Sequence, residues 1–265
     1  MPEMPEVEHI KQMINREVKN REVEGIEVLY AGVIKRPTDP NQFIHSLVGQ
    51  TLHHVDRRGK YLLFHFEESV LVSHLRMTGS YYVHQSTDSL ANYAAVIFQF
   101  SNDRQLRYHD LRKLGTMEIY GKNEPIVPIE RLGIEPLSEG FTVALLEELG
   151  MKSNRSIKSF LLDQRKVAGI GNIYADEICY KARINPGRKT LDITEIEWEH
   201  LYTTIMLVLK DAIAFGGGYT FFEKHGHYPF SLYQRAGSLC EQCGTEIERV
   251  VVTMRGTYYC PTCQK

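Results

Sequence analysis

The sequence predicts an α+β protein of more than one domain, in which a β-rich N-terminal part precedes a helical part and a short cysteine-containing hairpin. Three observations support this prediction. Short apolar runs separated by turn residues fill residues 23–120. Apolar residues then recur at helical spacing after residue 140, and four of the five cysteines lie after residue 239. A chain of 265 residues is long enough for two domains with separate cores.

The N-terminal part begins with a predicted amphipathic helix over residues 6–18. Its apolar side chains recur three or four positions apart, at Val7, Ile10, Ile14 and Val18. The β-rich runs that follow are typical of an antiparallel sandwich or barrel. We expect strands at residues 61–66, 70–75, 94–100 and 117–120.

A Pro- and Gly-containing stretch, residues 123–136, is predicted to be a linker, so the first domain spans residues 1–122. A helical domain follows over residues 137–229, with Thr194 and Glu197 forming a capping box on its longest helix and Gly216–Gly218 ending that helix. The expected helices cover residues 141–149, 156–162, 173–182 and 193–215. Residues 230–265 form the terminal hairpin.

The net charge of −2 excludes a uniformly basic nucleic-acid binder but permits local basic surfaces. Residues 152–189 contain nine Lys or Arg against three Asp or Glu, and residues 104–113 contain four against one. The longest apolar runs are far too short to cross a bilayer, and the first residues lack the pattern of a secretory signal. We therefore expect neither a membrane protein nor an exported one.

The last four cysteines form two C-x2-C pairs, Cys240 with Cys243 and Cys260 with Cys263, sixteen residues apart. This spacing predicts one tetrahedral, structural zinc ion, because four thiolates leave no position for a reactive water. Two disulfides are the alternative, which a chain without an export signal disfavours. Cys179 is expected to be a buried thiol within a helix.

Four further patterns suggest chemistry, each with a simpler alternative. Removal of Met1 would give Pro2 a free secondary amine, which can attack an electrophilic carbon; otherwise Pro2 is only a stiff N-terminal residue. Lys60, before an apolar strand, can reach a phosphate or lie in a solvated turn. The glycine-rich stretch 167–174 can present N–H groups to an anion or simply join two helices. Arg255, near the predicted hairpin tip, suits a phosphate or has no role.

These patterns occur together with others in one order, and the chain resembles the formamidopyrimidine-DNA glycosylase/endonuclease VIII family of base-excision repair enzymes. The resemblance runs nearly from end to end. It rests on six segments of the sequence: PEMPEVE from Pro2, RGKY from Arg58, HLRMTG from His74, DLRKLG from Asp110, residues 164–174, and RGT with CPTCQ from Arg255 to Gln264.

The resemblance implies a two-domain enzyme with an N-terminal β-sandwich, a helix-two-turn-helix domain and a zinc finger. It implies that the amine of Pro2 attacks C1′ of a damaged nucleotide, expels the base and forms a Schiff base, after which β- and δ-elimination cut the strand. Glu3 matches the family's catalytic acid/base and Glu6 a supporting carboxylate.

The resemblance also implies how damaged double-stranded DNA, or DNA with an abasic site, is bound. Four residues match ones that bind phosphates in the family: Lys60, His74, Asn172 and Arg255. We group Lys60 with the catalytic residues as well. Met77 and Arg112 match side chains that fill the gap left by the flipped nucleotide, and we place Lys113 with these DNA-binding residues. Phosphate contacts position DNA without reading its sequence, as damage recognition requires.

Three departures from the family pattern matter for function. Leu114 stands where the family usually has Phe, so probing of the opposite strand is expected to differ. Residues 218–239 form a stretch shorter than the family's loop that caps an oxidised purine, which predicts a preferred lesion other than 8-oxoguanine. Retention of Met1 would make the Pro2 nitrogen an amide, and the chain would then be a weak or silent relative that binds unusual DNA.

We expect a monomeric, cytoplasmic, nucleoid-associated bacterial enzyme that removes a damaged, oxidised base. A zinc-finger transcription regulator is disfavoured, because the predicted zinc unit has no histidine ligands and no base-reading helix.

Overall fold

The protein is described by a computed structural model that covers residues 1–218, 225–227 and 229–265. It divides into two compact units. Unit 1 contains Met1–Pro2 and Val7–Glu130, and unit 2 contains Glu3–Glu6 and Arg131–Lys265. The start of the chain therefore contributes four residues to the unit formed by the C-terminal half. The predicted boundaries at residues 122, 136 and 229 stay predictions.

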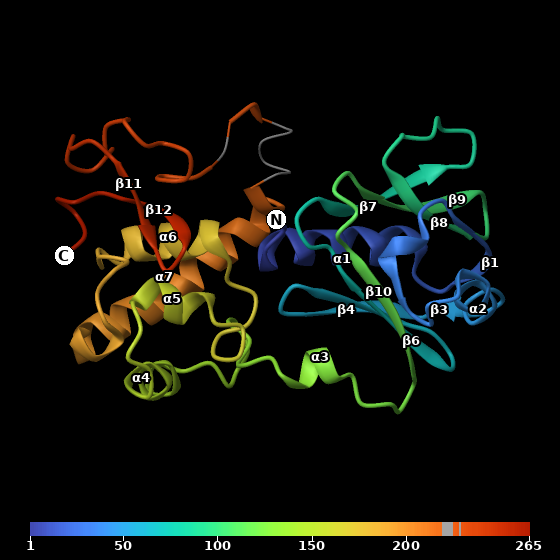
Figure 1. The fold of residues 1–265 in the computed structure, drawn as a ribbon, viewed down its shortest axis with the longest axis horizontal. Coiled ribbons are helices and arrows are strands. Elements are labelled where there is room, and N and C mark those ends of the chain that lie inside the picture. The colour runs from blue at the N-terminus through green and yellow to red at the C-terminus, as the bar shows by residue number, and fades with distance from the viewer. Residues whose placement is uncertain (219–224, 228) are drawn as a thin grey trace. The chain divides into compact units, whose positions relative to one another are not determined.

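Unit 1 is a sandwich of two five-stranded sheets, which confirms the predicted N-terminal architecture (Figure 1). The sheet orders are β3-β1-β8-β9-β7 and β2-β10-β6-β5-β4. All neighbouring strands are antiparallel except β10 and β2. The strands are β1 (Arg21–Val28), β2 (Ile34–Arg36), β3 (Thr51–Leu52), β4 (His54–Arg58), β5 (Tyr61–His65), β6 (Ser69–His74), β7 (Gly79–Gln85), β8 (Ala94–Phe100), β9 (Arg104–Asp110) and β10 (Thr116–Gly121).

Helix α1 (Met4–Val18) packs its apolar stripe into the core of the sandwich. Val7, Ile14 and Val18 are fully buried there, as their spacing predicts. The helix begins two residues before the predicted start at residue 6. The reason is that the side chain of Glu6 reaches back to the N–H of Glu3, as the third helical residue does in a capping box.

Short helical elements in unit 1 escaped the sequence analysis because they carry no repeated apolar pattern. Helix α2 (Pro40–His45) starts at a cap formed by Asp39, whose carboxylate accepts the N–H of Asn41. The segment Ala31–Val33 is a single turn of 3-10 helix. The predicted linker also contains α3 (Val127–Glu130), so it is not wholly irregular. Pro128 fits there because the first turn of a helix needs no N–H from it.

Unit 2 is helical, with α4 (Val143–Met151), α5 (Ile157–Leu162), α6 (Asn172–Lys181), a 3-10 turn (Thr190–Asp192) and α7 (Glu195–Ala214). Helix α7 carries the predicted capping box between Thr194 and Glu197. After it, Gly216 has φ +81°, the left-handed conformation that commonly ends a helix. Trp198 is fully buried in this core, and Gly150 leaves it room, since a Cβ at Gly150 would lie 2.2 Å from the indole.

The C-terminal hairpin pairs β11 (Glu248–Val252) with β12 (Arg255–Tyr259) and lies beside α6 (Figure 1). Thr253 and Met254 both have positive φ, which gives the tight two-residue turn favoured between antiparallel strands. Cys179 is a buried thiol on α6, as predicted. Within the described ranges, every helix is either too short or too polar to cross a membrane.

Candidate functional site

The carboxylate of Glu3 is buried against the first turn of α6. It accepts hydrogen bonds from the backbone N–H groups of Gly171 (2.8 Å), Ile173 (2.9 Å) and Tyr174 (3.3 Å). These are N–H groups that the helix itself cannot pair, and the helix dipole is positive there. A Cβ on Gly171 would lie 2.1 Å from Cδ of Glu3, so this approach requires glycine. We call Glu3, Glu6 and residues 171–174 the α6 start.

Glu6 joins the same cluster through three hydrogen bonds. Its carboxylate accepts the N–H of Glu3 (2.9 Å), the hydroxyl of Tyr174 (2.7 Å) and the N–H of Gly218 (2.8 Å). Burial raises the pKa of Glu6, and the negative charge of Glu3 raises it further. Burial and the neighbouring Glu6 also raise the pKa of Tyr174. The two predicted carboxylates therefore lie together, held by different partners.

Pro2 is buried and directly precedes the anchored Glu3 in the chain. While Met1 is attached, the Pro2 nitrogen is an amide and has no nucleophilic lone pair. Once Met1 is removed, it becomes a secondary amine whose position is limited by the single peptide bond to Glu3.

Gln164 organises the loop that leads into α6. Its amide nitrogen donates to the carbonyls of Leu162 (3.0 Å) and Ile170 (2.8 Å), and its oxygen accepts the N–H of Gly169 (2.9 Å). The carbonyl of Gly169 in turn accepts the N–H of Met4 (3.1 Å). The glycine-rich stretch predicted to join two helices therefore also holds the start of the chain.

Asn172 connects this loop to the C-terminal hairpin. Its side-chain nitrogen donates to the carbonyl of Gly256 at 3.1 Å, next to the exposed Arg255 at the start of β12. The Oδ1 atom of Asn172 is buried, and in the described part of the chain nothing hydrogen-bonds to it. The structure thus brings two predicted DNA-binding residues, Asn172 and Arg255, to the same end of unit 2.

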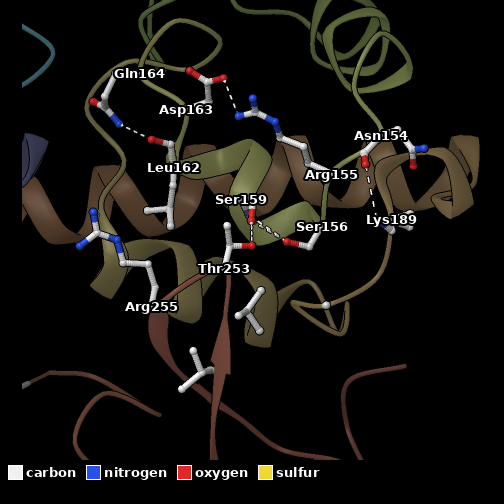
Figure 2. Close-up of a pocket in the computed structure, with 13 residues that line it drawn as sticks. Asn154, Arg155, Ser156, Ser159, Leu162, Asp163, Gln164, Lys189, Thr253 and Arg255 are labelled. Carbon is white, nitrogen blue, oxygen red and sulfur yellow. Dashed lines mark hydrogen bonds and ion pairs between the residues drawn. The ribbon is translucent and has the colours of Figure 1, made fainter.

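A groove of about 720 Å³ lies beside Arg255 within unit 2 (Figure 2). Three cations line it, Arg155, Lys189 and Arg255, together with the hydroxyl groups of Ser156, Ser159 and Thr253. Asp163 pairs with Arg155 at 3.3 Å, and Ser159 bonds to Thr253 at 2.6 Å. Arg155 and Lys189 were not predicted individually, although both belong to the positive segment 152–189.

A buried ion pair fixes the hairpin to the helices and was also missed. Nζ of Lys158, on α5, lies 2.7 Å from Oδ1 of Asp176, on α6, and donates to Thr257 (2.7 Å) and Gly256 (3.1 Å). Asp176 also accepts the N–H of Tyr258 (3.1 Å). Burial raises the pKa of Asp176 to about 7. These contacts hold the segment that carries Arg255.

In unit 1, Lys60 and His74 lie near the same end of a sheet, Lys60 in a turn and His74 at the end of β6. Lys60 follows Gly59 in the two-residue turn between β4 and β5, and its neighbour Tyr61 pairs in register with His74. Burial lowers the pKa of His74 to about 3, and Arg76 and Lys60 contribute. Nδ1 of His74 accepts the N–H of Arg76 at 3.0 Å. The neutral ring therefore carries its proton on Nε2 and can donate one hydrogen bond.

The predicted gap-filling residues lie on two loops of unit 1, residues 75–78 and 111–115, which we call the paired loops. The buried Asp110 joins them. It accepts the hydroxyl of Thr78 (2.6 Å) and the N–H groups of Gly115 (2.7 Å) and Arg112 (3.2 Å). The Thr78 hydroxyl also accepts the N–H of Arg112 (3.0 Å).

This anchoring leaves the side chains of the paired loops exposed. Met77 is 41% and Leu114 47% exposed, and Arg112 is exposed as well. Lys113 is also exposed, and its Nζ lies over the Tyr30 ring, 4.5 Å from the ring centre. Asp110 was quoted only as part of a motif in the sequence analysis, and its anchoring role had no sequence signal of its own.

The four cysteines of the predicted zinc site converge within 4.8 Å of one another. The Sγ atoms of Cys240 and Cys263 lie 3.9 Å apart, and those of Cys243 and Cys260 lie 3.4 Å apart. Zinc–sulfur bonds of about 2.3 Å in a tetrahedron separate the sulfur atoms by about 3.8 Å. The donor set and its spacing therefore fit one zinc ion.

Three family models match successive parts of the chain. The formamidopyrimidine-DNA glycosylase N-terminal domain matches residues 1–117, the H2TH domain of the same enzymes matches residues 132–223, and a zinc finger found in FPG and IleRS matches residues 237–265. The chain belongs to the formamidopyrimidine-DNA glycosylase family. The resemblance seen in the sequence is therefore confirmed, and the four cysteines form the structural zinc site of the family's finger.

Relatives match the chain over its full length. It is 42% identical to the formamidopyrimidine-DNA glycosylase of Shouchella clausii and 41% identical to that of Cytobacillus firmus, and the matches cover 100% of this chain and 99% and 100% of those proteins. A solved structure of Lactococcus lactis Fpg with DNA containing an abasic site has a TM-score of 0.90 at 33% identity, covering 99% of both chains. Another, with DNA containing FAPY-dG, has a TM-score of 0.91 at 33% identity, covering 99% of this chain and 100% of that one.

The loop predicted to be short, residues 218–239, lies partly outside the described residues. Glu177, on α6, fixes its described end by accepting the N–H groups of Ser231 (2.9 Å), Leu232 (2.8 Å) and Tyr233 (3.1 Å). Burial raises the pKa of this carboxyl. Glu177 was not predicted from the sequence.

Proposed function

We propose that this chain is a DNA repair glycosylase with abasic-site lyase activity, acting on double-stranded DNA that contains a damaged base or an abasic site. The observation that supports this most strongly is the α6 start, where three backbone N–H groups fix Glu3 beside the residue that becomes the chain's amine. Relatives that share the whole chain are named formamidopyrimidine-DNA glycosylases, and one has been solved with abasic-site DNA.

In this proposal the amine of Pro2, freed of Met1, is the nucleophile. Its nitrogen bonds to C1′ as the C1′–base bond breaks, and the base leaves with the electron pair and a proton. Protonation of the ring oxygen opens the sugar and gives an iminium ion. Glu3, held as a hydrogen-bond acceptor, takes the proton from the attacking amine and later returns one, while Glu6 supports the position of Glu3.

The iminium ion makes the C2′ proton acidic, so strand cleavage needs no further cofactor. Loss of that proton expels the 3′ phosphate, and a second elimination expels the 5′ phosphate. These are the β- and δ-eliminations. Zinc takes no part in them, because its four thiolate ligands leave no open position.

The chemistry requires the nucleotide to leave the base stack, since C1′ is otherwise blocked. We assign Met77 and Arg112 to the vacated space, because a flexible thioether and a planar guanidinium on exposed loops suit an apolar stack. The flanking phosphates would be bound by His74, Asn172 and Arg255, and by Lys60, which we also count among the catalytic residues. Lys113 would add a further positive charge.

The cationic groove beside Arg255 extends this phosphate-binding surface within unit 2. Arg155 and Lys189 are exposed cations, as a surface that follows the DNA backbone requires. Local basic surfaces then explain DNA binding by a chain whose net charge is −2. Affinity should fall with salt, by a log–log slope of about 0.9 per neutralised phosphate.

We assign the chain as a monomer whose preferred lesion is an oxidised base other than 8-oxoguanine, in the cytoplasm and associated with the bacterial nucleoid. The helix-two-turn-helix domain would span residues 137–229 and the zinc finger residues 230–265. The substrate assignment rests on the length of residues 218–239.

Borohydride trapping tests the proposed function. Mass spectrometry first establishes that the purified chain lacks Met1. That chain is then incubated with abasic-site DNA and sodium borohydride, next to Pro2→Gly and to a chain extended by Gly-Ser before Pro2. We expect a covalent adduct with the wild type, much less with Pro2→Gly, and none with the extended chain, although all three bind the DNA.

If the Met-free wild type binds abasic DNA without forming an adduct, the glycosylase proposal fails. The chain would then be the silent relative that holds unusual DNA. Retention of Met1 in the cell, shown by the same mass spectrum, would lead to that result for a chemical reason, because the nucleophile would be an amide.

A further inference from the structure

A second cluster of metal-binding side chains lies on strands β4 and β5 of unit 1, distant in sequence from the cysteines. His54 and Asp56 are two residues apart on β4, so they point to the same face of the sheet. His65, on β5, is the in-register partner of His54. Two neighbouring strands therefore place two imidazoles and one carboxylate on one patch.

The ligand atoms of this cluster lie close together. Oδ2 of Asp56 is 3.3 Å from Nε2 of His54 and 3.4 Å from Nε2 of His65. Zinc–nitrogen and zinc–oxygen bonds of about 2.0–2.1 Å in a tetrahedron separate ligand atoms by about 3.3–3.4 Å. The imidazole rings are stacked, with centres 4.4 Å apart. A rotation of the half-buried His54 ring would turn its lone pair toward the point that Asp56 and His65 share.

The position of His65 suits a metal ligand. Its Nε2 atom is buried, and no hydrogen bond to it is found among the described residues. The ring nitrogen of a histidine is the commonest metal ligand in proteins, and here it lies 3.4 Å from a carboxylate oxygen of Asp56.

We propose that His54, Asp56 and His65 bind one divalent transition-metal ion of the zinc class, with water completing its coordination. Imidazole nitrogen favours zinc, copper and nickel, and a single carboxylate gives too few oxygen ligands for calcium or magnesium. This site is separate from the zinc finger and does not depend on the proposed repair function.

The ion would join an edge strand to its neighbour. Strand β4 is the last strand of its sheet, and the side chain of Asn15 on α1 pairs with the N–H and carbonyl of Val55 on it, each at 2.8 Å. His54 and His65 lie at the end of the β4–β5 hairpin away from the Gly59–Lys60 turn. An ion there would hold the open end of the hairpin that carries Lys60, and so resist its fraying.

Equilibrium dialysis against zinc tests the proposal on the full chain with its finger already loaded. We expect the wild type to hold two zinc ions per chain and the variants His54→Ala and His65→Ala to hold one. His53→Ala is the matched control, because His53 is a neighbouring exposed histidine whose Nε2 lies 3.6 Å from Glu67 instead. It should keep two. Asp56→Asn, which keeps the shape of the side chain, should weaken the second site.

Nitrogen NMR of the histidine side chains gives a second readout that does not depend on stoichiometry. Added zinc should shift Nε2 of His54 and His65 in the wild type and leave His53 unchanged. One ion per chain in the wild type, with no shift of either ring, would overturn the proposal. So would a second ion that survives in both His54→Ala and His65→Ala.

Discussion

The α6 start in unit 2 and the paired loops in unit 1 are both held by hydrogen bonds between a buried carboxylate and backbone N–H groups, but they differ in which group is held. At the α6 start, the functional groups themselves are buried, and the backbone N–H groups of a helix hold the Glu3 carboxylate. On the paired loops, the assigned side chains are exposed, and a buried carboxylate, Asp110, holds the backbone beneath them. In both regions, a carboxylate accepts hydrogen bonds from backbone N–H groups.

The two regions differ in which atoms are restrained. A group that transfers a proton must stay at a fixed position, so its own atoms are restrained. A side chain that fills a gap in DNA must adapt its shape, so only its attachment is restrained. Met77 and Leu114 are accordingly exposed side chains on an anchored backbone, whereas Glu3 has both oxygens bonded. Substitutions at the two carboxylates should therefore have different consequences.

The largest effect is expected for Glu3→Gln. The amide keeps one acceptor oxygen but turns an N–H2 donor toward the N–H groups of α6, so we expect a loss of stability of about 1–3 kcal/mol. Base excision should fall at least about 100-fold, because the acid/base group is gone. Single-turnover excision and thermal unfolding measure the two effects. Glu24→Gln, on an exposed position of β1, is the control, and excision at the wild-type rate by Glu3→Gln would contradict the proposed role.

Asp110→Asn should act on the paired loops without touching the chemistry. Asparagine retains one acceptor, so either Gly115 or the Thr78 and Arg112 pair loses its hydrogen bond, at a cost of about 1–3 kcal/mol. Binding to DNA with a flipped lesion should weaken, while borohydride trapping on preformed abasic DNA at saturation should persist.

The control for this variant is Asp103→Asn, an exposed residue in the left-handed conformation that asparagine tolerates equally well. Equal DNA affinities of Asp110→Asn and Asp103→Asn would show that the loops do not depend on Asp110.

These two regions also show what the sequence can and cannot predict. The stripe of α1, the strand at Ala94–Phe100 and the cap at Thr194 depend on neighbours in sequence, and they were found. Asp110 and the pair of Lys158 with Asp176 depend on contacts that only the folded chain creates, and they were missed. The zinc ligands were found from their spacing, whereas the roles of Pro2, Lys60 and Arg255 came from the resemblance, because the residue patterns left simpler alternatives open.

A smaller effect is expected for His74, where the first of the paired loops begins. This residue should make the stability of the fold depend on pH. The unfolded chain binds a proton there near pH 6.5, whereas burial keeps the pKa of folded His74 at about 3. The unfolded state therefore binds more protons between these values, and the stability due to His74 is complete above pH 6.5 and is lost as the pH falls.

Urea unfolding at pH 5 and pH 7.5 measures this contribution. His74→Gln should narrow the difference in stability between the two pH values, and His45→Gln, on the exposed face of α2, should leave it unchanged. Part of the difference should survive in His74→Gln, since burial also lowers the pKa of His109 to about 4. If the stability of His74→Gln differs between the two pH values by as much as that of the wild type, the buried, neutral state of His74 is contradicted.

The smallest effect is expected for Leu114→Phe, which restores the ring that the family usually has. Leu114 is 47% exposed, so the stability of the free protein should barely change. Stacking on a DNA base should strengthen binding to flipped DNA by about 1 kcal/mol. Fluorescence titration with abasic duplexes that differ in the opposite base measures this, and weaker binding by Leu114→Phe would rule out a place for Leu114 at the opposite strand.

The identity of the attacking nitrogen is the central claim, and peptide mapping of the borohydride adduct tests it most directly. Two amines are candidates, the N-terminal nitrogen of Pro2 and the side chain of Lys60. Digestion of the trapped complex followed by tandem mass spectrometry should place the sugar remnant on Pro2 nitrogen in a chain that begins at residue 2. A remnant on Lys60, or on any residue of a chain that still begins with Met1, would contradict the account.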